Sequence, residues 1–403
     1  MLFAASRREA FLKRIYFESL KTSTVVNHFI VSTTETYMST GQEGSMIWQT
    51  LPLHAPLLPS RIVMLGLWSI KVVFCVILVL FCFEVLLGNR RFDDLSRANS
   101  HSARRSNLQL HGEANCYGHF ADKSLFYEAE TMRRDCELSG SPLTRSEVRI
   151  ATLTAHFGAH TPVWDRAIRS HHLLTLVHGM PMHVMCSQVI QGMWNKPAFI
   201  LSILLDEMVK PAEDRLQWLF WADRDTLVLN HCRHPSAFLP PAEMADTHLL
   251  TTKDWNGLNN GVFLLRVSEW SISLFSDILA FPHYRPHVQL TFNDQSAMEL
   301  LLRADRYNSG VEYVPQHWFN AFPGPGGWKD FENRADTKDL EDGVARRGDF
   351  IVHFAGSGDK GAWVETWDVM LRRVGNVWKS GRGQRDMTEE VKNFWRKSTS
   401  QAA

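Results

Sequence analysis

The sequence predicts an α/β fold with a Rossmann-like, mostly parallel sheet, preceded by one transmembrane helix. From residue 148 onward, short apolar runs alternate with blocks of helical spacing, which is typical of βαβ units. Residues 216–222 are apolar throughout, as expected of a central strand buried on both faces. Residues 62–87 are apolar apart from Ser69, Lys71 and Glu84, and a membrane span needs about 20 such residues.

The first 146 residues lack the pattern of a packed domain. Residues 1–60 have no sustained periodicity and are expected to be poorly ordered. We interpret residues 61–88 as a signal anchor, because their flanks disfavour the alternative of a buried hydrophobic helix. The polar residues 89–146 are typical of a stem. More arginines follow the apolar stretch than precede it, which opposes a luminal C-terminal part, and no N-x-Ser/Thr site indicates the orientation.

One domain over residues 147–380 accounts for the alternating pattern that follows. Strands are expected at residues 148–155, 182–186, 216–222, 247–252, 262–267, 311–315 and 350–354. Helices are expected at residues 161–178, 196–209, 269–279 and 294–302. A helix at residues 389–396 is expected within a C-terminal tail, residues 381–403.

Composition narrows the function classes. Lys and Arg total 43, as do Asp and Glu, so there is no basic field to attract nucleic acid, which we exclude as a partner. The 14 tryptophans suit either a large aromatic core or a protein that stacks planar or sugar rings. The six cysteines show neither zinc spacing nor a disulfide framework, and a bridge between Cys116 and Cys136 is the alternative in an oxidising compartment.

Two acids mark the end of the strand expected at residues 216–222. Ligands of open α/β sheets lie outside the carboxyl ends of the strands, where Asp223 and Asp225 follow. Side chains at i and i+2 of an extended segment point the same way, so both acids can converge on one hard cation. Arg224 then points elsewhere and is interpreted as a packing or loop-anchoring residue. The alternative is a strand end with solvated acids.

Two further motifs carry polar groups next to expected strands or helices. The N-G-L-N-N-G segment at 256–261 is expected to be a loop whose glycines and amides can line a hydroxyl-rich ligand. A hairpin turn without a ligand is the alternative. Asn293 and Asp294 begin the helix expected at 294–302, where the simplest interpretation is an N-cap.

His353 ends the last expected strand, and Gly356 and Lys360 follow it. A histidine in this position is often structural. Together with the two acids, however, His353 can supply a nitrogen ligand to the same metal. Backbone N–H groups near Gly356 and the ammonium of Lys360 can then offset the charge of a diphosphate.

The order of these motifs resembles glycosyltransferase family 34, the fungal and plant group of galactosyl-, mannosyl- and xylosyltransferases. The resemblance covers residues 149–361 and is carried by W-N-K at 194–196, F-W-A-D-R-D-T at 220–226, D-W-N-G-L-N-N-G at 254–261, N-D-Q-S-A at 293–297, V-P-Q at 314–316 and G-D-F-I-V-H-F-A-G at 348–356. It implies a GT-A type nucleotide-diphospho-sugar transferase fold, a UDP- or GDP-sugar donor, a glycan acceptor and a divalent ion, commonly manganese (Mn2+). It also implies a single-pass type II Golgi membrane enzyme with a luminal catalytic domain, in complexes with other Golgi glycosyltransferases.

The resemblance also implies a role for each matching residue. The metal ligands would be Asp223, Asp225 and His353, and the catalytic residues facing the anomeric carbon would be Asp294 and Gln295. The residues binding the nucleotide sugar would be Lys196, Asp223, Asn256, Gly257, Asn259, Asn260, Gly356 and Lys360. This sequence departs from the family pattern at Arg224, a position that is often small, and in the three residues that precede Lys360.

The hypothesis is a retaining transfer of a hexosyl unit (galactose or mannose) or a pentosyl unit. Either Asp294 acts as a transient nucleophile, or the acceptor attacks on the departing face with help from Gln295; family analogy favours the second. One alternative is a non-catalytic Golgi scaffold of the same fold. The other is a D-x-D phosphohydrolase, a class that usually has Thr or Val where this chain has Leu227.

Overall fold

The computed structural model describes residues 108–113, 116–118, 123–138, 148–156, 161–334, 340–375 and 386–402. The chain divides into two units, Met1–Glu84 and Val85–Ala403, and every described residue belongs to the second. The segment predicted to be poorly ordered (1–60) and the predicted anchor (61–88) lie outside the described residues. Of the helices described, none combines the length and apolar character needed to cross a membrane.

Seven strands form one mixed, mostly parallel sheet in the order β1-β3-β2-β4-β7-β6-β8. Their bounds are Leu108–His111 (β1), Ile150–Ala155 (β2), Met182–Met185 (β3), Trp218–Ala222 (β4), Leu249–Asp254 (β6), Gly257–Arg266 (β7) and Val311–Tyr313 (β8). The predicted α/β class is confirmed. Strand β7 runs antiparallel to both neighbours, because a tight hairpin joins it to β6. The end of β4 lies beside the middle of β7, where Ala222 pairs with Val262, so the first residues of β7 extend past β4.

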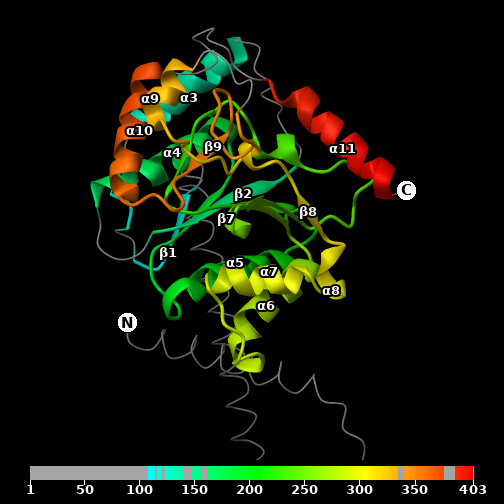
Figure 1. The fold of residues 1–403 in the computed structure, drawn as a ribbon. Coiled ribbons are helices and arrows are strands. Elements are labelled where there is room, and N and C mark those ends of the chain that lie inside the picture. The colour runs from blue at the N-terminus through cyan, green and yellow to red at the C-terminus, as the bar shows by residue number, and fades with distance from the viewer. Residues whose placement is uncertain are drawn as a thin grey trace, which may run out of the picture. The chain divides into compact units, whose positions relative to one another are not determined.

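Helices cover both faces of the sheet (Figure 1). Helices α5 (Asn195–Met208), α6 (Glu269–Tyr284) and α7 (Asp294–Leu302) pack on one face, against alternate β4 residues such as Leu219 and Trp221. The other β4 side chains enter a second core with Trp318. The remaining helices are α3 (Lys123–Leu138), α4 (Pro162–His178), α8 (Asp305–Asn308), α9 (Gly327–Asn333), α10 (Lys360–Val374) and α11 (Thr388–Ala402), with short 3-10 turns at Gly192–Trp194, Pro235–Phe238 and Gln316–Trp318.

The strand expected at 350–354 lies outside the large sheet. Its counterpart β9 (Ile351–His353) pairs antiparallel with β5 (Thr226–Val228), the segment that directly follows the two acids. In this register Thr226 lies opposite His353. The pairing places His353 next to the acids. Local sequence patterns cannot predict a pairing between segments this far apart in the sequence.

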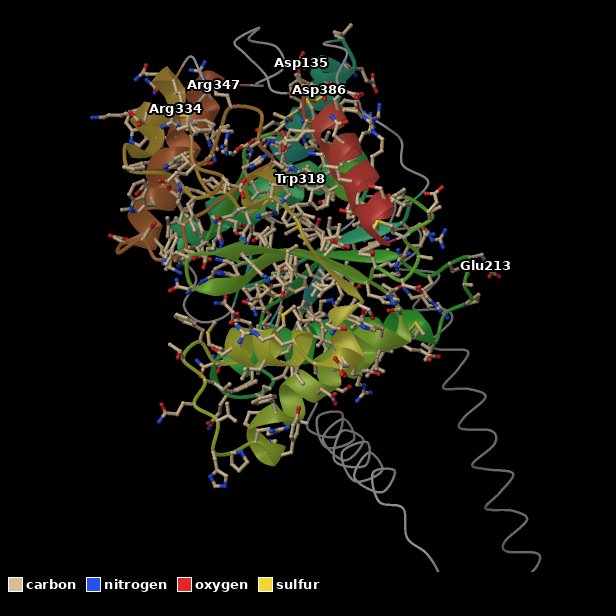
Figure 2. All side chains as sticks on the ribbon, turned by 45° about the vertical axis from the view of Figure 1, so that its right-hand side comes forward. Asp135, Glu213, Trp318, Arg334, Arg347 and Asp386 are labelled. Atoms are coloured by element: carbon tan, nitrogen blue, oxygen red, sulfur yellow. A yellow bond between two sulfur atoms is a disulfide. The ribbon has the colours of Figure 1, made fainter. Side chains whose placement is uncertain are left out.

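The predicted tail helix is confirmed as α11. It packs against the α/β domain, which we call the head. Figure 2 shows Trp318 among the packed side chains beneath this helix. The ring of Phe394 lies edge-on to Trp318 with centroids 5.0 Å apart, and Trp318 Nε1 donates to Glu390 Oε1 over 2.9 Å. The helix therefore completes the core on this side of the sheet.

The prediction of a stem over residues 89–146 is wrong for the segments 108–111 and 123–138. Strand β1 pairs with β3 at the sheet edge, and α3 packs against α4 through Leu125 and Leu173. Few apolar residues interrupt this polar segment, so its composition resembles a stem although those few lie on one helix face.

The cysteine prediction is also wrong, because two disulfides join this N-terminal segment to the head. Cys116 bonds Cys186 and Cys136 bonds Cys232, over separations of 70 and 96 residues. The alternative pair of Cys116 with Cys136 does not form. Such distant partners meet only through the tertiary fold, so cysteine spacing could not predict them.

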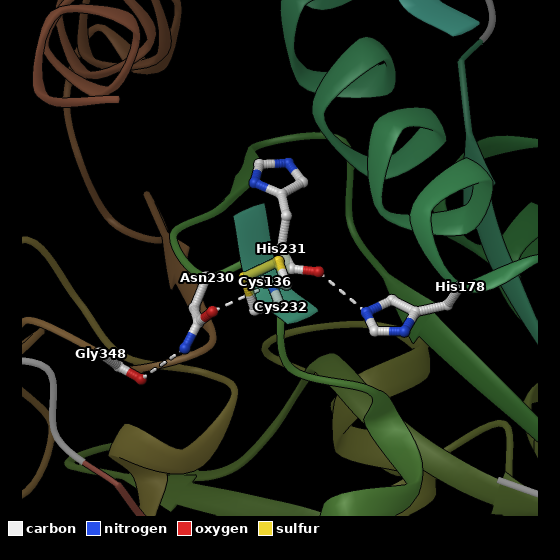
Figure 3. Close-up of a disulfide and its surroundings, with 6 residues drawn as sticks. All are labelled: Cys136, His178, Asn230, His231, Cys232 and Gly348. Atoms are coloured by element: carbon white, nitrogen blue, oxygen red, sulfur yellow. Dashed lines mark hydrogen bonds between the residues drawn. A yellow bond between two sulfur atoms is a disulfide. The ribbon is translucent and has the colours of Figure 1, made fainter. Parts of the chain in front are cut away.

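Polar contacts support the second disulfide (Figure 3). The Asn230 amide accepts a hydrogen bond from Cys232 N over 3.1 Å and donates to Gly348 O over 3.4 Å. The ring of His178 contacts His231 O over 2.8 Å. The disulfide between Cys136 of α3 and Cys232 is thereby linked through hydrogen bonds to α4 and to the loop that precedes β9.

Buried histidines make the stability of the fold dependent on pH. Burial lowers the pKa of His171 to about 3, and that of His172 and His234 to about 4. An unfolded histidine titrates near pH 6.5. Because the unfolded chain binds more protons between these values, stability is complete above about pH 6.5 and is lost as the pH falls toward 4. At pH 5 the expected loss is about 2 kcal/mol for each such histidine.

Urea unfolding at pH 7 and pH 5, followed by tryptophan fluorescence, measures this loss. His172→Phe is the matched variant, because His172 packs edge-on to Tyr117 and Phe126 and a phenyl ring can replace it there. We expect the variant to show a smaller difference between the two pH values. Equal unfolding midpoints at pH 7 and pH 5 in the unmodified chain would contradict the prediction.

Candidate metal and donor site

Two carboxylates and one imidazole meet at the carboxyl end of β4. Ligand atoms of Asp223, Asp225 and His353 all lie within 4.8 Å of one another. The shortest of these contacts that involves the ring joins His353 Nε2 and Asp225 Oδ1 over 3.6 Å. Asp225 and His353 are buried, whereas Asp223 is half-buried. Oxygen and imidazole ligands in this number suit a divalent ion such as manganese.

Asn320 orients the imidazole. Its amide nitrogen donates to Thr252 Oγ1 over 2.7 Å and to Asn259 Oδ1 over 3.1 Å, so its oxygen faces His353. His353 Nδ1 lies 2.8 Å from that oxygen and therefore carries the proton. Nε2 is left to face Asp225, as in metal sites where a second residue fixes the histidine tautomer. Asn320 lies in none of the sequence motifs, so its role was not predictable from the sequence.

Asp225 lies between two nitrogen groups. Lys360 Nζ contacts its Oδ2 over 2.5 Å, on the side away from the His353 contact. Burial alone would raise the pKa of Asp225, but His353 and Lys360 outweigh burial and hold that pKa well below its usual range. Asp225 is therefore a carboxylate at neutral pH. Lys360 is the first residue of α10, and its side chain keeps 44% exposure toward solvent.

Lys196 is buried, and its ammonium group contacts Asp223. Its Nζ is 3.1 Å from Asp223 Oδ1 and 3.1 Å from both Asn260 oxygens. A longer contact of 3.9 Å reaches Asp294. Burial opposes its charge, but Asp223 and Asp294 outweigh burial and raise the pKa of Lys196. The ammonium thus balances the acids from within the protein.

Asn260 joins the residues predicted to be catalytic to this cluster. Its side-chain nitrogen donates to Asp294 Oδ2 over 2.9 Å, and its backbone N–H donates to Gln295 Oε1 over 3.3 Å. Burial raises the pKa of Asp294. Asn293 makes no side-chain cap to α7 and has φ +48°, the one positive value at a non-glycine among the described residues. The N-cap interpretation is wrong, and the strained backbone positions Asp294 instead.

The N-G-L-N-N-G segment is mostly strand, so the prediction of a loop is wrong. Only Asn256 of this motif belongs to the turn, and β7 begins at Gly257. Asn259 is buried and donates to Asp254 Oδ2 over 2.8 Å, which makes it a supporting residue beneath Asn320. The alternation of strand side chains thus turns Asn259 and Asn260 to different partners.

Residues 240–362 match the galactosyl transferase GMA12/MNN10 family. The chain is 22% identical over 267 residues to Xyloglucan 6-xylosyltransferase 4 of Arabidopsis thaliana, covering 55% of this chain and 48% of that protein. It is 24% identical over 193 residues to Probable alpha-1,6-mannosyltransferase MNN10 of Saccharomyces cerevisiae (strain ATCC 204508 / S288c), covering 40% of this chain and 48% of that protein. The matched family and both relatives support the resemblance to glycosyltransferase family 34. The chain spans about half the length of both curated relatives.

Solved structures similar to this chain include two glycosyltransferases. One is involved in the glycosylation of the major capsid of PBCV-1, with TM-score 0.42 and 13% identity over 55% of this chain and 99% of that chain. The other is GlyE in Streptococcus pneumoniae TIGR4, with TM-score 0.37 and 13% identity over 57% of this chain and 63% of that chain.

Two residues within the sequence motifs, Gly261 and Arg224, have roles that depend on their neighbours in the structure. Gly261 ends the N-G-L-N-N-G motif next to His353, where an added Cβ would lie 2.1 Å from His353 Cε1. The sequence indicated only a loop glycine here, because the contact with His353 depends on the tertiary fold. Within D-R-D, Arg224 is exposed and stacks on Trp164, 4.5 Å from the ring centroid. The prediction of a packing role for Arg224 is confirmed.

Proposed function

We propose that this chain is a metal-dependent, retaining glycosyltransferase of GT-A type that moves a hexosyl or pentosyl unit from a nucleotide sugar to a glycan hydroxyl. The convergence of Asp223, Asp225 and His353 in a chain that resembles family 34 carries the proposal. The names of the curated relatives, a xylosyltransferase and a probable alpha-1,6-mannosyltransferase, support both sugar classes.

The three ligands would hold a divalent ion such as manganese (Mn2+), which supplies Lewis-acid stabilisation of the leaving diphosphate. Lys360, at the first turn of α10, presents an exposed ammonium next to the same acids. Gly356 is exposed after β9 with φ +69°, so backbone there can approach a phosphate closely. Lys196 is enclosed behind Asp223, where it offsets carboxylate charge and orients Asn260.

In the proposed reaction the bond between the anomeric carbon and the diphosphate oxygen breaks, and its electron pair leaves on the diphosphate. The acceptor hydroxyl oxygen bonds the anomeric carbon on the same face, and its proton passes to the departing phosphate oxygen. Asp294 supports this route over nucleophilic attack, because it is buried and already bonded to Asn260. A trapped glycosyl-Asp294 adduct would overturn the same-face route.

We also propose that the enzyme is a single-pass type II Golgi membrane protein with a luminal head, anchored by residues 61–88. The two disulfides support an oxidising compartment. Protease protection of intact membranes tests the orientation. Digestion of the head from the cytoplasmic side would contradict it.

A donor screen tests the proposed activity. The full-length chain in detergent is offered UDP- and GDP-sugars with Mn2+, and both nucleoside diphosphate release and sugar transfer are measured. We expect turnover of one donor class that stops when the ion is chelated. Turnover of simple phosphoesters instead would favour the phosphohydrolase, and no turnover of any donor would favour the non-catalytic scaffold.

The tautomer-fixing residue gives a separate prediction. Asn320→Leu removes the acceptor of His353 Nδ1–H, so Mn2+ affinity should fall by about 10- to 100-fold. Asn320→Asp keeps an oxygen in this position and should lose less. Titration of Mn2+ by calorimetry measures both variants. Equal affinity of Asn320→Leu and the unmodified chain would show that Asn320 does not position the ligand.

A further inference from the structure

Trp255 is a large apolar side chain that remains 75% exposed. It lies at the tip of the β6–β7 hairpin, where its ring packs edge-on to Phe322 with centroids 5.1 Å apart. One face of the indole is thereby supported while most of its surface stays open. An exposed aromatic ring on a fixed support is suited to stacking a planar or sugar ring.

The hairpin holds Trp255 firmly. Asp254 accepts hydrogen bonds from Asn256 N over 2.7 Å and from Asn259 Nδ2 over 2.8 Å. Gly257 has φ +105°, and a Cβ added there would lie 2.6 Å from Glu299 Oε1. Contacts on both sides of the tryptophan therefore fix the turn. Binding of a ligand would then require little further loss of conformational entropy in the hairpin.

A cavity of about 550 Å³ opens beside this ring. Its size lies within the range of about 300–1,000 Å³ that is typical of ligand pockets. Trp255, Phe322 and Trp363 provide aromatic walls. The charged lining residues are Lys253, Asp254, Glu341 and Asp342. Because acids outnumber the lysine among these groups, the lining disfavours an anion such as a diphosphate and suits neutral hydroxyls that accept and donate hydrogen bonds.

The cavity lies close to the candidate metal site, because Phe322, which lines it, also packs near His353. The ring of Phe322 has its centroid 6.1 Å from that of His353, and Gly356 lines the cavity wall. The hairpin of β6 and β7 lies on one side of β4, whereas β2 and β3 lie on the other. The carboxyl ends of β2, β3 and β4 leave space for the nucleotide on their own side. The cavity beside Trp255 adjoins the hairpin side of β4.

We propose that this cavity binds the acceptor as a neutral oligosaccharide, with one sugar ring stacked on Trp255 next to Phe322. The proposal rests on the glycosyltransferase function proposed above and adds the chemical class and the binding surface of the second substrate. Trp255 is then a specificity-determining residue that acts on the acceptor without contact to the donor phosphates.

The test is Trp255→Ala in the full-length enzyme, assayed with a nucleotide sugar, Mn2+ and a panel of neutral gluco-, galacto- and manno-oligosaccharides. We expect the KM for the acceptor to rise roughly tenfold, as for the loss of one stacked ring. The KM for the donor and the rate of the slow hydrolysis of the donor by water should be unchanged. Tyr127→Ala is the matched control, because Tyr127 is 77% exposed on α3 and does not line the cavity.

Two outcomes would overturn the proposal. An unchanged acceptor KM would show that Trp255 does not contact the acceptor, and a raised donor KM would assign the ring to the nucleotide. If the unmodified chain turns over no donor, the proposed activity fails by itself. Binding of the same oligosaccharides, followed by tryptophan fluorescence and calorimetry, then still decides whether Trp255→Ala removes a glycan site.

Discussion

Asp225→Ala is expected to abolish metal-dependent sugar transfer, with a loss of about a thousandfold or more. Asp225 is the buried carboxylate of the three-ligand cluster and is ionised at neutral pH because His353 and Lys360 outweigh its burial. Without it, the ion would lose a charged ligand and would hold the leaving diphosphate less well. The fold should persist, because Lys360 has solvent access and can be hydrated when its partner is removed.

Transfer of labelled sugar and urea unfolding are measured on the same preparations. Asp225→Asn keeps the size of the side chain and removes its charge, so it should lose activity nearly as completely. Asp214→Ala is the matched control on an exposed acid outside the cluster and should keep full activity. Activity of Asp225→Ala near that of the unmodified chain would contradict the metal role.

Gly261→Ala is expected to cost both activity and stability, although it adds a single methyl group. That methyl carbon would lie 2.1 Å from His353 Cε1. The backbone of Gly261 cannot retreat freely, because its carbonyl accepts from Asp223 N over 2.8 Å and its N–H donates to Asn259 Oδ1 over 2.9 Å. His353 must therefore move away from the acids. We expect about 100-fold loss of transfer and a cost of about 1–3 kcal/mol in unfolding free energy.

Mn2+ affinity, transfer rate and the urea midpoint are the measurements for Gly261→Ala. Gly361→Ala is the matched control, because a Cβ there meets only ordinary contacts from 3.4 Å outward and alanine favours the helix it joins. A Gly261→Ala variant with unchanged Mn2+ affinity would show that His353 can shift without loss of the site.

The sequence predicted the central strand and the position of the two acids, because both depend on local pattern. The apolar run indicates a buried strand, and Asp223 and Asp225 indicate where that strand ends. This part of the fold is confirmed. The sequence also indicated His353 at the end of a strand, but it could not indicate which strand pairs with that one. The antiparallel pairing of β5 with β9 depends on contacts between segments more than a hundred residues apart.

Long-range packing explains what the sequence did not predict. Asn320 acts through a side chain that lies in no motif, and Gly261 matters only because His353 packs against it. The disulfide of Cys136 with Cys232 likewise depends on α3 being docked on the head. In each case the residue type is compatible with several roles. The role is determined by which residues the tertiary fold places next to it.

Binding of Mn2+ in the presence of a nucleoside diphosphate tests the central claim most directly. Electron paramagnetic resonance counts the bound ion in the unmodified chain, in Asp225→Ala and in His353→Ala. We predict one bound Mn2+ for each unmodified chain, with the signal lost or strongly weakened in both variants. Equal Mn2+ binding in all three proteins would contradict the assignment of Asp223, Asp225 and His353 as the metal site.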